Sequence, residues 1–235
     1  MSESHEDEIL PPKREKTDYV DSVMETAISA IPILGAPALR LFNLVITPPL
    51  EQRLNEWRNT VADRILRLED KVEGFKVMDL GKNPMFITAV MQATQIALRN
   101  HQKEKLEALQ NAVVNSAIGI DIEEDLQLLF LNLVDSFTIL HLRILTYLNN
   151  PKKWLQDHGL VLNLVMGGVN SGLELAFPEL KDQRYIYDPI VQDLYNRGLL
   201  HTDKSTLHAM VSTTGMTASQ TTELGRKFLS YISKN

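Results

Sequence analysis

The stretch that decides the fold is residues 48–72, which read PPLEQRLNEWRNTVADRILRLEDKV. Proline is tolerated in the first turn of a helix, where its missing N–H is not needed, so Pro48-Pro49 is suited to a helix start. Behind it, large apolar residues recur at spacings of 4, 3, 4, 4, 3 and 4, namely Leu50, Leu54, Trp57, Val61, Ile65, Leu68 and Val72. This pattern predicts one long amphipathic helix that ends before Gly74. Its apolar stripe is suited to packing within the monomer or against a second copy.

Further helices are predicted downstream. Asn83-Pro84 and Asn150-Pro151 each combine an N-cap residue with a proline at the first helical position, so each predicts a helix start. Another helix is expected to end near Gly119. Asp121, with a glutamate three residues on, has the form of a capping box. We expect it to open a strongly apolar helix that runs to Leu148 and forms the most buried element of a bundle.

The pattern changes after Gly159, where glycine and proline break the chain into shorter pieces. Asp188-Pro189 predicts the start of a helix, and residues 199–210 and 211–217 are expected to form two short strands joined by a turn. A closing helix is predicted over residues 222–232. Helix, hairpin and final helix together describe a winged-helix-like module. The predicted fold class is mainly α, a helical bundle followed by a small winged-helix-like α+β module.

Three parts are therefore expected along the chain. Residues 1–16 are polar and hold Pro11-Pro12, which predicts a disordered N-terminal arm. Residues 17–158 are expected to form the helical bundle, and residues 159–235 the winged-helix-like module. The first residues lack the basic and then apolar order of a secretory signal, and the chain has no cysteine, so a cytoplasmic location is expected.

Composition and charge exclude several classes of protein. Hydrophobic residues make up 44% of the chain and charged residues 23%, which excludes disorder of the whole chain. The formal net charge is −6, and residues 151–235 carry nine basic and eight acidic side chains, a balance of +1. No segment forms a strongly basic surface for a phosphate backbone, which weakens a nucleic-acid interpretation.

The motifs that carry chemistry are missing from the sequence. The six histidines lie on different predicted elements, and none stands at a metal-ligand spacing from another histidine or a carboxylate. His141 is best explained as a hydrogen-bonded structural histidine. The glycine-rich run at residues 167–172 lacks the Lys-Ser or Lys-Thr of a phosphate loop and the order of a nucleophile elbow. We therefore expect no enzyme, no catalytic or metal site, no cofactor and no small-molecule substrate.

An apolar stretch over residues 26–50 raises the question of a membrane. Its only charge is Arg40, but Pro32, Gly35 and Pro37 would break a spanning helix. Two short helices packed on the bundle are the favoured interpretation, and a membrane-active hairpin is the alternative. The candidate membrane-contact residues are Ile31, Leu34, Leu41 and Phe42.

Three basic residues of the last module are candidates for contact with DNA or a protein partner. Arg184, Arg197 and Lys204 are placed to flank a recognition helix. Asp188 and Asp193 fall on the same helix, however, so a protein-contact role is favoured over DNA.

A family resemblance covers the chain from Asn83 to Ile232. It rests on loose patterns of helix packing: Glu104-Lys105-Leu106, Asn111-Ala112, Asn115, Phe130, Leu133, Asp135, His141-Leu142, Leu145, Asn150-Pro151, Asp193-Leu194, Gly198-Leu199-Leu200 and Thr222-x-x-Gly225-x-x-Phe228-Leu229. Together these residues resemble the bacterial abortive-infection alpha (Abi-alpha) family. The resemblance implies a helical protein linked to phage defence, with no catalytic residues to carry over.

The sequence therefore predicts a non-enzymatic protein-interaction or regulatory protein, with phage defence as the setting that the resemblance implies. A protein partner or self-association is expected. Two alternatives stay open: a DNA-binding transcriptional regulator that uses the C-terminal module, and a membrane-active effector that uses residues 26–50.

Overall fold

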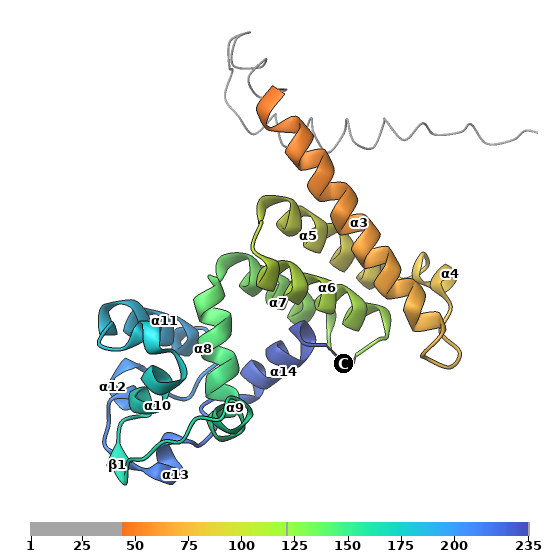
Figure 1. Ribbon diagram of the computed structural model, residues 1–235. Coiled ribbons are helices and arrows are strands. Elements are labelled where there is room, and N and C mark those ends of the chain that lie inside the picture. The colour runs from red at the N-terminus through yellow and green to blue at the C-terminus, as the bar shows by residue number, and fades with distance from the viewer. Residues whose placement is uncertain (1–43, 121, 235) are drawn as a thin grey trace, which may run out of the picture. The chain divides into compact units, whose positions relative to one another are not determined.

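The computed structural model describes residues 44–120 and 122–234 (Figure 1). These residues belong to two compact units, one ending at Glu56 and the other beginning at Trp57. In the first unit the described residues hold the start of helix α3 (Thr47–Glu69). The predicted arm and the candidate membrane-contact residues Ile31, Leu34, Leu41 and Phe42 lie outside the described residues.

The second unit is built almost entirely of helices, which confirms the predicted mainly helical class. In chain order its elements after α3 are α4 (Val77–Leu80), α5 (Pro84–Arg99), α6 (Lys103–Ala117), α7 (Glu124–Ser136), α8 (Ile139–Asn149), α9 (Pro151–Asp157), β1 (Met166–Gly167), α10 (Val169–Ala176), the 3₁₀ turn η1 (Pro178–Leu180), α11 (Arg184–Asn196), α12 (Lys204–Leu207), β2 (Val211–Ser212), α13 (Thr213–Met216) and α14 (Glu223–Ile232). Within the described residues the two short strands form one antiparallel ribbon, with Met166 opposite Ser212 and Gly167 opposite Val211.

The long helix predicted over residues 48–72 is confirmed as α3. From Trp57 onward its stripe enters the core of the second unit, because Trp57, Val61 and Ile65 are all buried. The indole Nε1 of Trp57 donates to the hydroxyl of Thr94 on α5 over 2.9 Å, so the polar end of this buried side chain is satisfied.

The predicted helix starts at Asn83 and Asn150 are also confirmed. The side-chain oxygen of Asn83 accepts from the backbone N–H of Phe86, and that of Asn150 accepts from the N–H of Lys153, each over 3.1 Å. The helix end expected near Gly119 is present too: α6 ends at Ala117, and Gly119 follows in the left-handed region at φ +70°.

The apolar helix expected to run to Leu148 is interrupted, so that prediction is wrong in its extent. Helix α7 begins at Glu124 and ends at Ser136, and Phe137 is extended and buried. Thr138 then caps α8 through a reciprocal capping box with His141, so a second helix begins there. Asp121, the expected cap, lies outside the described residues.

The two strands expected over residues 199–217 are not formed as a hairpin. Asp203 caps the short helix α12, and Ser212 accepts from Gly215 N–H to cap α13, so local capping prevails over β propensity there. The strand β2 pairs with β1 instead. A single antiparallel bridge between Leu200 and Thr221 closes the intervening loop.

One hydrophobic core extends through the second unit, from Trp57 to Ile232. Helices α5, α6 and α7 pack on one another, and α14 packs on α6 and α8 (Figure 1). Residues on both sides of the predicted 158/159 boundary therefore share one core. Whether residues 159–235 fold independently stays a prediction.

Buried amides attach the last helix to α6. Asn115 Nδ2 donates to the carbonyls of Tyr231 over 2.7 Å and Ser233 over 2.9 Å, and Asn111 Nδ2 donates to that of Ile232 over 2.9 Å. The last carbonyls of a helix have no partner within it, so the two amides satisfy the buried carbonyls of Tyr231 and Ile232.

Candidate functional site

The candidate site lies on the exposed face of α11. This helix buries Tyr187, Val191 and Leu194 at helical spacing, and the three are completely inaccessible. Its opposite face is polar and open. The sequence predicted a start at Asp188-Pro189, but α11 begins at Arg184 and Pro189 lies inside it. A proline within a helix loses one hydrogen bond, and here the burial of the apolar face offsets that loss.

A hollow of about 500 Å³ runs along this exposed face and reaches α12. Two basic residues, two carboxylates, two amides, a tyrosine and a proline line it: Arg184, Lys204, Asp188, Asp193, Gln192, Asn196, Tyr185 and Pro189. The Tyr185 side chain is 76% exposed, which is unusual for a large aromatic residue. The hollow thus combines an open aromatic ring with balanced charges.

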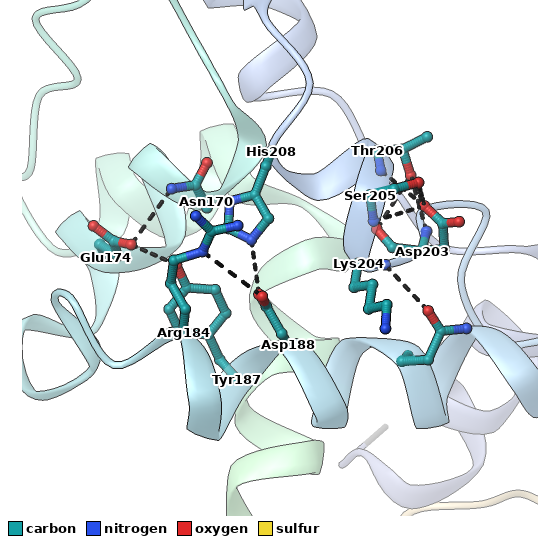
Figure 2. Close-up of polar contacts among 11 residues, drawn as sticks. Asn170, Glu174, Arg184, Tyr187, Asp188, Asp203, Lys204, Ser205, Thr206 and His208 are labelled. Carbon is teal, nitrogen blue, oxygen red and sulfur yellow. Dashed lines mark hydrogen bonds and ion pairs between the residues drawn. The ribbon is translucent and has the colours of Figure 1, made fainter.

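Asp188 organises the base of the hollow (Figure 2). Its Oδ1 lies 2.7 Å from Nε2 of His208, which follows α12, and its Oδ2 lies 3.7 Å from Nε of Arg184. His208 and Asp188 are largely buried, with side-chain exposures of 18% and 21%. This pair joins α11 to the end of α12 and fixes the two walls of the hollow relative to each other.

A second polar contact lies beneath α11. The hydroxyl of Tyr187 donates to Glu174 Oε1 on α10 over 2.6 Å, and Asn170 Nδ2 approaches the same oxygen at 3.4 Å (Figure 2). Burial, followed by the bond to Glu174, raises the pKa of Tyr187 above its ordinary value. Tyr187 therefore stays protonated and serves as a structural donor that holds α10 against α11.

The wall formed by α12 is set by its cap. Oδ1 of Asp203 accepts from the N–H groups of Ser205 and Thr206 over 3.0 and 2.8 Å (Figure 2). The bonds from Thr206, followed by those from Ser205, lower the pKa of Asp203 to about 2. The backbone N–H of Lys204 donates to Gln192 Oε1 over 3.5 Å, so Lys204 is held at the rim with its side chain in the hollow.

The three basic residues singled out in the sequence have different environments. Arg184 and Lys204 line the hollow together. Arg197 does not line it. Its Nε lies 3.0 Å from Asp193 Oδ2, and its guanidinium carbon lies 5.1 Å from the centre of the Phe137 ring, within the reach of about 6 Å of a cation–π contact. Arg197 thus contributes to packing between α11 and the segment before α8.

Tyr185, Gln192 and Asn196 were not singled out in the sequence. They follow from helical spacing once the helix begins at Arg184, because residues three and four apart share a face. A helix that starts at Asp188-Pro189 does not contain Tyr185, so the sequence did not predict that Tyr185 shares a face with Gln192 and Asn196.

His141 is hydrogen-bonded and mostly buried, as expected. Its Nδ1 lies 2.8 Å from Thr138 Oγ1, its ring stacks on Phe137, and its Nε2 lies 3.5 Å from Asp193 Oδ2. Burial, which outweighs the attraction of Asp193, lowers the pKa of His141. The neutral ring at the start of α8 is therefore favoured.

The described part of the chain offers neither a metal-binding cluster nor a membrane-spanning helix. Residues 44–120 and 122–234 hold no group of three or more His, Asp or Glu side chains placed to bind a metal ion. Over the same residues, no helix combines the length and apolarity that crossing a bilayer requires. Comparison of the chain with protein-family models, curated proteins and solved structures found no match.

Proposed function

We propose that this chain is a non-enzymatic protein-interaction or regulatory protein that binds a protein partner through the hollow on α11. The observation that carries this proposal is the lining of the hollow, in which an exposed tyrosine, Tyr185, is combined with the basic residues Arg184 and Lys204. Tyrosine and arginine are the side chains that most often dominate the energy of protein interfaces, because each adds a large contact area with a polar end.

The balanced charge of the hollow favours a polypeptide over a nucleic acid. Its lining carries two basic and two acidic side chains, so it offers no net attraction to a phosphate backbone. A polypeptide segment can present both signs of charge and a backbone for Gln192 and Asn196 to bind. We infer a partner with a carboxylate placed to reach Lys204 and Arg184.

A photocrosslinking experiment in cells tests this proposal. A photoreactive phenylalanine at position 185 is expected to form an adduct with a defined protein. The matched control is the same substitution at Met78, which is 83% exposed on α4. Lys204→Glu is then expected to abolish the adduct at position 185. Equal adducts at positions 185 and 78, or an adduct that Lys204→Glu leaves intact, would contradict the proposal.

DNA binding is the second candidate function, because Arg184 and Lys204 lie in one hollow. If the region around α11 acts as a winged-helix-like module, the chain binds duplex DNA at low salt, and Arg184→Ala with Lys204→Ala removes the shift in a gel assay. Lys152→Ala, at an exposed position on α9, is the control. Absence of a complex at low salt would end this alternative.

The setting and location also belong to the proposal. The resemblance to the abortive-infection alpha family suggests a role in phage defence, and the cysteine-free composition supports a cytoplasmic location. The membrane-active alternative concerns residues 26–50, and Leu41→Asp or Phe42→Asp tests it: loss of liposome leakage without loss of stability would support a membrane effector.

A further inference from the structure

A short apolar run leads from α9 to β1 (Figure 1). Residues 160–166 read LVLNLVM. Val161 and Val165 are 71% and 85% exposed, and Asn163 between them is exposed, whereas Leu160 and Leu162 pack partly on the core. Leu164 and Met166 are exposed as well, at 43% and 60%, so most of the apolar side chains of the run are open. An exposed run of this kind is suited to pairing with another chain.

The backbone of the run is available for hydrogen bonds. The carbonyls of Leu164 and Val165 accept from Thr213, whose Oγ1 lies 2.5 Å from the first and whose N lies 3.2 Å from the second. These contacts anchor the run beside α13. No N–H group from Val161 to Val165 has a partner among the described residues. A lipid surface would leave these N–H groups unpaired, but a strand of another polypeptide would satisfy them.

The sequence of the run is nearly a palindrome about Asn163. Val161 matches Val165, Leu162 matches Leu164, and Leu160 corresponds to Met166, which is apolar and of similar length. When two copies of one strand pair antiparallel about a two-fold axis, each residue faces its mirror position. Here that arrangement places apolar residues opposite apolar residues and an amide opposite an amide.

The distribution of charge also permits a second copy of this chain at this run. Two molecules with a formal charge of −6 repel each other, so self-association is easiest where charged side chains are missing. Residues 158–173 and 205–222, which hold both strands of the ribbon, contain no Asp, Glu, Lys or Arg. Two copies can therefore meet at this run without placing like charges together.

We propose that residues 160–166 form an antiparallel strand pair with the same residues of a second copy, with Asn163 on the two-fold axis. The run shares no residue with the hollow on α11, and the proposal is independent of the function assigned to that hollow. Seven residues a side is well below the roughly 20 to 30 of a standard interface, so the dimer is weak and forms at high protein concentration.

Disulfide crosslinking tests the axis directly, since the full chain has no cysteine of its own. Directly opposed Cα atoms are about 4.5 to 5.5 Å apart, within disulfide reach. Asn163→Cys is therefore expected to form a disulfide-linked dimer on mild oxidation. Val161→Cys is the matched control, because two such positions are offset by four residues, about 13 Å. A mixture of Val161→Cys and Val165→Cys is expected to give a mixed dimer.

Charge substitutions test the register by sedimentation. Val165→Lys is expected to weaken the dimer at least about tenfold, because the charge is desolvated against Val161 of the second copy. Met78→Lys, a change of the same kind at another exposed position, is expected to leave association unchanged. Val161→Lys combined with Val165→Glu is expected to restore association, because in the antiparallel register each new lysine faces a new glutamate of the second copy.

Each variant is first checked for an unchanged melting curve, which is expected because positions 161, 163 and 165 are exposed. Equal rates of crosslinking at positions 163 and 161 would overturn the proposal. So would a monomer at all concentrations up to about 1 mM. Binding of the monomer to lipid vesicles, lost in Val165→Lys, would assign the run to a membrane instead and overturn the strand pair.

Discussion

The attachment of α14 by Asn115 gives the sharpest test of the fold. Asn115 is 1% exposed, and its Nδ2 lies 2.7 Å from Tyr231 O, 2.9 Å from Ser233 O and 3.2 Å from Ser230 O. In Asn115→Ala the carbonyl of the buried residue Tyr231 loses this donor, whereas Ser230 and Ser233 are exposed residues whose carbonyls are less costly to leave without it. A buried hydrogen bond contributes about 1 kcal/mol, and an acceptor left unpaired costs about 1 to 3 kcal/mol.

The expected loss of unfolding free energy is about 3 kcal/mol for Asn115→Ala, because the three bonds share one donor and do not add in full. For a chain of this size that corresponds to a fall in Tm of roughly 6 to 12 °C. Urea unfolding followed by circular dichroism measures the change. Asn59→Ala, at an exposed position on α3, is the control and is expected to stay within about 0.5 kcal/mol of the parent.

The pH dependence of Asn115→Asp distinguishes the loss of the hydrogen bonds of Asn115 from the loss of its side-chain volume. At neutral pH a carboxylate would face several carbonyl oxygens, so this variant is expected to be less stable than Asn115→Ala. Burial raises the pKa of such a carboxyl group, so protonation restores stability relative to Asn115→Ala as the pH falls. A loss below about 1 kcal/mol in Asn115→Ala, or no difference in pH dependence between the two variants, would refute the role of Asn115 as a cap.

Three further changes have defined outcomes. Tyr147→Phe is expected to leave the Tm unchanged or raise it slightly, because the buried hydroxyl of Tyr147 has no hydrogen-bond partner within the described residues; a large loss would show an unrecognised partner. Because the pKa of His141 is lowered in the folded state, the unfolded state binds a proton at a higher pH than the folded state does. The free energy of unfolding therefore falls as the pH drops through about 6.5, the ordinary pKa of histidine. His141→Gln is expected to reduce this fall, as measured by urea unfolding at several pH values. Arg197→Ala is expected to cost about 1 to 2 kcal/mol, whereas Arg184→Ala stays within about 0.5 kcal/mol, as measured by urea unfolding.

Features set by neighbouring residues could be predicted from the sequence. Asn83-Pro84 and Asn150-Pro151 satisfy and shape a first turn with their own atoms, and both cap helices as expected. The apolar stripe of α3 was predicted to place Trp57, Val61 and Ile65 on one face, because helical spacing alone decides this, and all three are buried.

Features set by distant contacts could not be predicted in this way. Pro189 resembles a helix start locally, but α11 begins five residues earlier, at Arg184. The earlier turn is stabilised because Tyr187 is buried against α10, which is a contact between two different helices. The break between α7 and α8 depends on the Thr138–His141 pair and on Phe137 packing against Phe228 of the last helix. The hollow on α11 likewise needs His208, twenty residues from Asp188, to bring α12 beside it.

The two proposed contact surfaces rely on different forces, and this difference separates them experimentally. The hollow on α11 has charged groups at its rim, so salt screens their attraction to a partner, over a distance of about 8 Å at physiological ionic strength. The run at residues 160–166 has no charge, and its association rests on apolar burial and backbone bonds. Raising the salt concentration is therefore expected to weaken partner binding at α11, while pairing through the run is unchanged or strengthened, because the repulsion between two acidic chains is screened as well.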